Sequence, residues 1–280
     1  MTTDDKWPIP IRGGNAYQAI LSKLRENPLA QKMAKGVYES YGDFLTYAES
    51  QEALSSKFRF DIQHEPIISF KTASILLRLG TGREAEALVH ELLHLQLPIQ
   101  GFSLIEGAEI SDEIPEESSK AFVDMYGPIQ NLVHHEINIG NFKALGYLKR
   151  DFLGSASPPP FDYKRKVLNT LPHSYDWHIG FSWWCLEYFR HWISLRHGRS
   201  LEVNNHAKDA LQWGSEVHPT LKQAAEGMME WVKFGEFKNS SQYVDQVNNL
   251  LEIMKIPKVT KWVLLECPNP QRPIAKRLIL

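Results

Sequence analysis

The segment Glu86–Leu97 reads EALVHELLHLQL and contains the pattern HExxH, formed by His90, Glu91 and His94. Residues four apart on an α-helix lie one turn apart on the same face, so both imidazoles can reach one metal ion. Glu91 follows His90 at about 100° around the helix axis. This position places the carboxylate beside the metal, where a general base takes a proton from an attacking water.

The residues around the motif favour a helix. Apolar residues cluster opposite the two histidines and predict a buried back with the histidines turned toward other groups. These apolar residues are Ala85, Leu88, Leu92 and Leu95. Thr81 with Glu84 three residues later predicts a capping box at the start of the helix, and Pro98 predicts its end. The alternative is a surface helix whose two histidines align without binding a metal.

The composition is that of an ordinary globular protein. Of the 280 residues, 43% are hydrophobic and 23% are charged, and the formal net charge is -2. This charge gives no reason to expect nucleic acid or an anionic membrane as a partner. The polar segment Met1–Pro8 predicts no secretory signal, and the most apolar stretch, Trp177–Leu195, contains charged residues that argue against a membrane span.

The chain has two cysteines, Cys185 and Cys267, which are far apart in the sequence. Two isolated thiols form neither a disulfide framework nor a CxxC site, so we expect a reducing, cytoplasmic compartment. A structural zinc ligated by sulfur is therefore effectively excluded, and histidine and carboxylate remain as the expected ligands.

The order of predicted elements indicates an α+β, predominantly helical protein. Short strands predicted at 57–63 and 67–70 would form a small antiparallel sheet that precedes the motif helix. A further helix is predicted from Pro128 to Lys149, with the proline in its first turn. Near the N-terminus we expect a helix at Tyr17–Glu26 and a second helix that begins with Asn27 as its cap and Pro28 in its first turn.

The proline-rich segment Gly154–Pro160 predicts a linker, because three consecutive prolines cannot continue a helix. It divides the chain into a metal-binding catalytic domain, residues 1–153, and a helical C-terminal region, residues 161–280, packed on it. In the second part we predict helices near 177–197, 200–213, 219–233 and 240–254, followed by a strand at 259–265.

Catalytic zinc usually has three protein ligands and one open position. Three consecutive residues, His134, His135 and Glu136, are candidates for the third ligand. On a helix, His135 shares its face with Asn131 and Asn138, whose amides can orient its ring or polarise groups in the cleft. We predict His135 as the third ligand. His134 and Glu136 are the alternatives, as is a site without a third protein ligand.

Four other polar residues are secondary candidates for stabilising a developing oxyanion: Tyr126, His173, Tyr175 and His178. Each is more often a structural residue, because a single hydrogen-bond donor of this kind can come from anywhere in a fold.

The motif and its surroundings, over about Phe58–Tyr147, resemble the zincin metallopeptidases. In that superfamily a short antiparallel sheet precedes the motif helix, and its edge strand aligns an extended peptide, a role that the resemblance implies for 67–70. It also implies zinc ligation by His90 and His94 and general-base catalysis by Glu91.

The resemblance does not assign a subfamily. Leu97 and Gln100 stand where a metzincin has glycine and histidine. A gluzincin has a glutamate in a short motif that begins with asparagine on a later helix, but here Asn131 is followed by a glutamate only at Glu136.

The sequence therefore predicts a cytoplasmic zinc-dependent metallopeptidase that cleaves peptide bonds of a peptide or protein substrate. Its cofactor would be Zn²⁺, held by His90, His94 and His135, with Glu91 as the general base. The alternative is a non-catalytic or regulatory protein of zincin fold that binds a protein partner.

Overall fold

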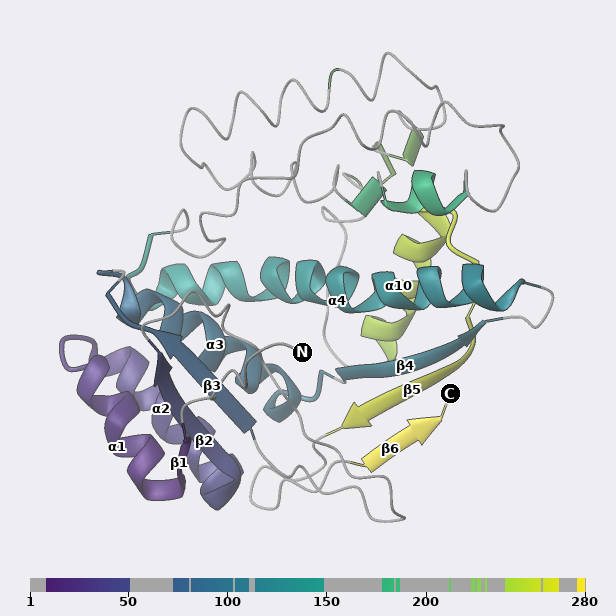
Figure 1. The fold of residues 1–280 in the computed structure, drawn as a ribbon. Helices are drawn as coiled ribbons and strands as arrows, with labels where there is room; N and C mark the ends of the chain where they lie inside the picture. The colour runs from purple at the N-terminus through teal and green to yellow at the C-terminus, as the bar shows by residue number, and fades with distance from the viewer. Residues whose placement is uncertain are drawn as a thin grey trace, which may run out of the picture. The chain divides into compact units, whose positions relative to one another are not determined.

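The computed structural model shows an α+β protein that is predominantly helical, as predicted (Figure 1). It describes residues 9–50, 73–80, 82–102, 104–110, 114–148, 178–183, 185–186, 212, 223–224, 226–227, 230, 240–257, 259–266 and 276–279. The chain divides into two compact units. The first comprises Met1–Phe102, Asn141–Leu148 and Leu265–Arg277, and the second comprises Ser103–Gly140, Lys149–Leu264 and Leu278–Leu280. The predicted linker at 154–160 lies outside the described residues, so the boundary proposed there stays a prediction.

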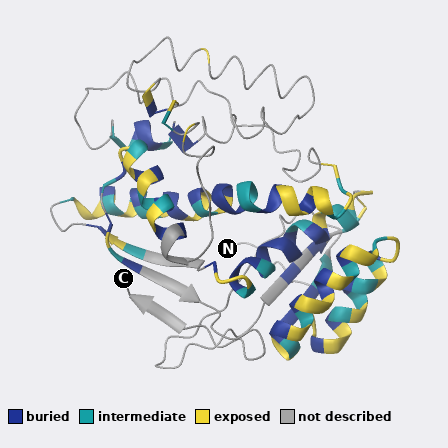
Figure 2. Ribbon diagram, turned by 180° about the vertical axis from the view of Figure 1, so that it is seen from behind, coloured by how far each residue is buried: buried dark blue, intermediate teal, exposed yellow. Residues whose placement is uncertain are grey.

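The first unit begins with two amphipathic helices, α1 (Gly13–Lys23) and α2 (Pro28–Tyr41), which expose one face and bury the other (Figure 2). The predicted cap of α2 is confirmed, because Asn27 Oδ1 accepts a hydrogen bond of 3.0 Å from the Ala30 N–H and Pro28 is the first helical residue. Helix α1 differs from the predicted range Tyr17–Glu26 at both ends, since it begins four residues before Tyr17 and ends at Lys23.

The sheet of this unit has the order β1-β2-β3, formed by β1 (Ile11–Arg12), β2 (Leu45–Ser50) and β3 (Ala73–Arg78). Strands β1 and β2 are antiparallel, whereas β2 and β3 are parallel. A small sheet therefore precedes the motif helix as predicted, with an antiparallel pair and one parallel neighbour. The strands predicted at 57–63 and 67–70, including the implied peptide-aligning edge, lie outside the described residues.

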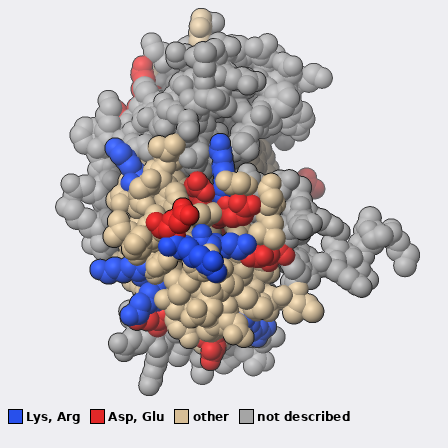
Figure 3. Space-filling model, turned by 90° about the vertical axis from the view of Figure 1, so that its left-hand side faces the viewer, with Lys and Arg blue, Asp and Glu red and all other residues tan. Residues whose placement is uncertain are grey.

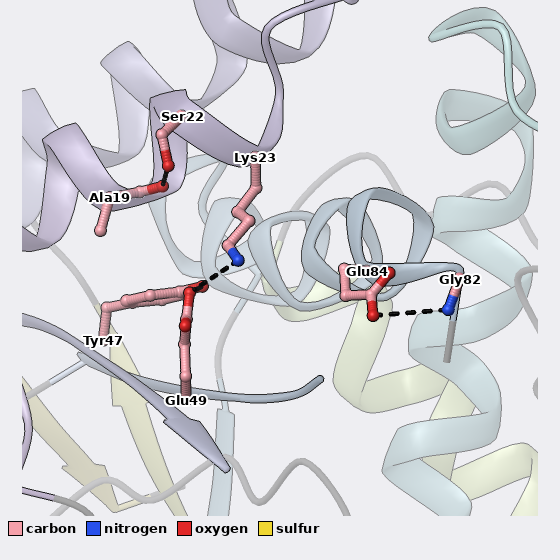
Figure 4. A network of polar contacts seen from close by, with 7 residues as sticks. All are labelled: Ala19, Ser22, Lys23, Tyr47, Glu49, Gly82 and Glu84. Carbon is pink, nitrogen blue, oxygen red and sulfur yellow. Dashed lines mark hydrogen bonds and ion pairs between the residues drawn. The ribbon is translucent and has the colours of Figure 1, made fainter. Parts of the chain in front are cut away.

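A polar network joins α1 to the end of β2 (Figure 4). Lys23 Nζ lies 3.0 Å from Glu49 Oε1, and the Tyr47 hydroxyl donates to the same oxygen at 2.7 Å. Burial alone would raise the pKa of Glu49, but the hydrogen bonds from Tyr47 and Lys23 outweigh it and lower the pKa. The network thus satisfies a half-buried carboxylate while it fixes the helix on the sheet.

The second unit contains β4 (Leu104–Ile110), the long helix α4 (Glu116–Ala144, which ends in the first unit), α10 (Ser240–Ile253) and β5 (Val259–Glu266, which also ends in the first unit). Strand β5 lies between β4 and β6 (Lys276–Ile279). The predictions of a helix at 240–254 and a strand at 259–265 are confirmed.

Two other predictions for this unit have different outcomes. The prediction of a helix from Pro128 to Lys149 is wrong at both ends, because α4 begins at Glu116, contains Pro128 in its interior and ends at Ala144. The helices predicted near 177–197, 200–213 and 219–233 lie largely outside the described residues. The positions that are described there are helical, namely 178–183, 185–186, 212, 223–224, 226–227 and 230.

The described surface mixes charges of both signs. Figure 3 shows lysine and arginine side chains next to aspartate and glutamate on one face of the molecule. Lys35 and Glu39 form such a pair one helical turn apart, at 3.6 Å. Within the ranges that the structure describes, no helix combines the length and the apolarity needed to cross a membrane.

Candidate metal centre

The HExxH motif lies on α3 (Glu84–Ile99). The predicted capping box is wrong as the start of this helix: its N-cap is Arg83, whose side chain makes no cap hydrogen bond, and Thr81 lies outside the described residues. Glu84 instead accepts a hydrogen bond of 3.4 Å from the Gly82 N–H (Figure 4). Glu84 and Glu86 place negative charge in the first turn, where the helix dipole favours it.

The end of α3 also differs from the prediction, because Pro98 lies within the last turn. The helix is closed by the Gly101 N–H, which donates to the Pro98 carbonyl at 3.1 Å, and by the Phe102 N–H, which donates to the Leu97 carbonyl at 3.0 Å. Gly101 has a φ of 88°, so this is a Schellman motif with glycine in the left-handed position. A proline so near the end removes only one helical hydrogen bond, which the packing of the helix tolerates.

The body of α3 is buried on most of its circumference. Leu88, Leu92 and Leu95 are fully buried, as the helical pattern predicted, whereas Ala85, also predicted for the buried back, is only half-buried. Val89, Leu93 and Leu97 are buried as well. The Tyr41 hydroxyl on α2 donates to the Leu95 carbonyl at 3.0 Å and holds the two helices together. Two of the three motif residues are consequently buried, with Glu91 9% and His94 8% exposed, and His90 is half-buried.

The two motif histidines face each other. His94 Nε2 lies 3.1 Å from His90 Nε2, and the two ring planes are tilted by 49°. Two ligand nitrogens on a tetrahedral zinc are about 3.3 Å apart when each zinc–nitrogen bond is about 2.0–2.1 Å. The observed separation therefore fits a pair of nitrogens that share one ion.

Helix α4 carries the three candidates for the third ligand, and His134 has a different environment from its neighbours. His134 is 4% exposed, and its Nε2 lies 3.3 Å from the hydroxyl of Tyr243 on α10. Burial lowers the pKa of His134 to about 3, so its ring is neutral at physiological pH. His134 is thus a core histidine of the second unit. Glu136 is half-buried on the same helix.

The structure brings together three of the predicted ligands. His90, His94 and His135 each offer one ring nitrogen, and these atoms all lie within 4.8 Å of one another. Neither His134 nor Glu136 belongs to this group. Three imidazole nitrogens form a donor set that could hold a metal ion and that suits zinc, copper, iron or nickel.

The secondary candidates lie elsewhere or outside the described residues. Tyr126 is on α4, nine residues before His135 and therefore about 180° away around the helix. It is 3% exposed and packs edge-on against Trp262, with ring centroids 5.3 Å apart. His178 lines a cavity of about 840 Å³ in the second unit, together with residues of α10 and Trp262. His173 and Tyr175 are outside the described residues.

The partner of His134 has no signal in the sequence, because Tyr243 is 109 residues away. The hydroxyl of Tyr243 is itself deeply buried, and burial raises its pKa. His134 and Tyr243 thus form a buried polar pair in an apolar core. A proton added to the imidazole there would be poorly solvated.

We expect this buried histidine to make the protein sensitive to acid. The folded pKa of His134, about 3, lies below its ordinary value of 6.5, so the unfolded chain binds the proton first as the pH falls below 6.5. Between pH 6.5 and pH 5 this contributes a loss of about 2 kcal/mol from the free energy of unfolding. Urea titrations at several pH values measure it.

The double variant His134→Phe, Tyr243→Phe removes the titrating ring together with its hydroxyl partner. Its free energy of unfolding should depend less steeply on pH in this window, whereas Tyr243→Phe alone should keep the steep dependence. Equal slopes for the wild type and the double variant would show that His134 does not titrate as its burial implies.

Comparisons of the chain with family models, with curated proteins and with solved structures found no significant match.

Proposed function

We propose that the protein is a zinc-dependent hydrolase, and specifically a metallopeptidase that cleaves peptide bonds. The observation that carries the proposal is the meeting of His90, His94 and His135, whose ligand nitrogens lie within 4.8 Å of one another. Two of these histidines belong to an HExxH motif on a buried helix, which provides a glutamate at the position where a general base is needed.

Zinc is the metal that this donor set supports best. A catalytic zinc has three protein ligands, commonly histidines, and an open fourth position. Cys185, the cysteine that the structure describes, is buried, and burial raises the pKa of its thiol, which disfavours the thiolate that binds metals. His90, His94 and His135 would therefore hold the ion, and zinc, when bound, would acidify water and polarise a carbonyl group.

Glu91 supplies the proton transfers in this proposal. It follows His90 at about 100° around α3, so its carboxylate lies beside the ligand pair and is not itself a ligand. As water adds to the substrate carbonyl, Glu91 accepts a proton from it and then delivers this proton to the leaving amine. Its exposure of only 9% leaves few bulk waters to compete for that proton.

The proposal is tested by metal analysis and by hydrolysis of a peptide library with the full-length chain. We expect one zinc per chain, peptide cleavage that a chelator abolishes, and recovery of cleavage when zinc is restored. Bound zinc should also stabilise the fold by about 4 kcal/mol at a free concentration about 1,000 times its Kd.

Absence of zinc binding would overturn the proposal. A chain that binds one zinc but cleaves neither the library nor denatured proteins would contradict the hydrolase and support a binding protein instead.

A further inference from the structure

The side chain of Asn138 is an unusual feature of α4. Asn138 is 1% exposed, and among the described residues its Nδ2 has no hydrogen-bond partner. A buried N–H that has lost its water and found no acceptor costs free energy, and such groups are rare in native proteins. An amide kept in this state indicates an acceptor that the described residues do not supply.

The position of Asn138 on α4 points to where that acceptor would lie. Asn138 follows His135 by three residues, so the two side chains are neighbours on one face of the helix, with Cβ atoms about 5–6 Å apart. Tyr126 also has a buried hydroxyl without a hydrogen-bond partner among the described residues, but it lies about 180° from His135 and packs against Trp262. Of these two unsatisfied side chains, only Asn138 lies on the same face of α4 as His135.

We propose that Asn138 Nδ2 donates a hydrogen bond to the carbonyl oxygen of the substrate at the metal centre. This inference rests on the proposed hydrolase function and adds a residue that touches the reacting group. The carbonyl oxygen gains negative charge as water adds to the carbon, so a fixed donor stabilises the transition state more than the substrate. The amide carries no charge and does not titrate, so its donor is present at every working pH.

A purely structural Asn138 would behave differently from a donor reserved for substrate. If the amide were part of a satisfied core network, its replacement by an apolar residue would lower the melting temperature. If the amide is unsatisfied in the free protein, leucine of similar size removes an unfavourable group, and the protein becomes more stable while it loses function.

The first measurement is the melting temperature of Asn138→Leu and of a matched control, Asn141→Leu, which makes the same change at an exposed position of α4. The control accounts for the better helix propensity of leucine. We expect the Tm gain of Asn138→Leu to exceed that of the control by about 3 °C. A Tm below that of the control would overturn the proposal.

The second measurement is ligand binding to the cobalt-substituted full chain, followed by the visible absorption of Co²⁺. The probe is acetohydroxamic acid, which presents oxygen atoms to a metal as a reacting carbonyl would. We expect its Kd to rise about 10- to 100-fold in Asn138→Leu and to stay unchanged in Asn141→Leu, with Co²⁺ affinity the same in all three proteins. Asn138→Ala, which removes the same donor without adding bulk, should weaken the probe equally.

The two proposals fail in distinguishable ways. If the wild type binds neither Co²⁺ nor the hydroxamate, the metal centre is overturned and the role of Asn138 with it. If the wild type binds both, and Asn138→Leu and Asn138→Ala bind the hydroxamate as tightly, only the role of Asn138 is overturned. Once a cleaved peptide is identified, we expect Asn138→Leu to lower kcat by about 100-fold with little change in KM, because it removes the donor.

Discussion

Replacement of Glu91 by glutamine is expected to lower kcat/KM for peptide hydrolysis by about 10²- to 10⁴-fold. Glutamine has the shape of glutamate but cannot accept the proton of the attacking water. Because Glu91 is not one of the proposed zinc ligands, Glu91→Gln should still bind one zinc per chain. Steady-state kinetics and metal analysis on the same preparation measure both quantities.

Glu86→Gln is the matched control for this experiment. Glu86 lies in the first turn of the same helix, outside the motif, and is half-buried. We expect its activity to stay within about twofold of the wild type, because it loses only a modest interaction with the helix dipole. Full activity in Glu91→Gln, or equal losses in both variants, would reject Glu91 as the general base.

Replacement of His135 by alanine is expected to weaken zinc binding by more than about 100-fold, since even loss of a residue that only supports a ligand costs about 10- to 100-fold. His135 is one of three nitrogen donors within 4.8 Å of one another, so its loss leaves two protein ligands. Competition with a chromogenic chelator measures the affinity.

The adjacent residue supplies the control, because His134→Phe changes a histidine of the same helix that contacts Tyr243. This variant should be less stable, since it removes the contact between the His134 ring and the Tyr243 hydroxyl, but its zinc affinity should change by only a few-fold. If His134→Phe loses zinc and His135→Ala keeps it, the third ligand has been misassigned.

Local signals in the sequence predicted the elements that depend on neighbouring residues. Asn27 and Pro28 indicated the cap of α2 because a cap needs only a side-chain acceptor and a residue with fixed φ. The apolar spacing of 240–254 likewise predicted α10. These features are decided within a few residues, so no distant contact can overrule them easily.

The prolines show where such signals fail. Pro98 and Pro128 were expected to end and to start helices, but both lie inside helices in the structure. A proline removes one hydrogen bond and crowds the preceding turn, at a cost of about 3 kcal/mol. The burial of the leucines of α3, and of Phe122, Met125 and Ile129 on α4, outweighs that cost. This burial depends on tertiary contacts, so the local sequence around each proline does not reveal it.

The candidate site was predictable only in part, because some of its features depend on local spacing and others on distant contacts. The spacing of His90 and His94 needs only a helix, whereas the choice between His134 and His135 depends on how α4 is rotated about its axis. That rotation is fixed by partners such as Tyr243, which no local pattern connects to α4. Strands β2 and β3 were missed because short apolar runs such as Ala73–Arg78 do not distinguish a strand from a helix segment.

The adjacency of His134 and His135 couples the candidate metal centre to the packing of the protein core. Side chains of consecutive helical residues point about 100° apart, so α4 cannot turn to improve the contact of one without displacing the other. A mutation at Tyr243, 109 residues from His134 in the chain, is therefore expected to alter the candidate metal centre, because it disturbs His134, which is adjacent to His135. Substitutions in this part of the core and at the candidate metal centre are therefore expected to have coupled, non-additive effects.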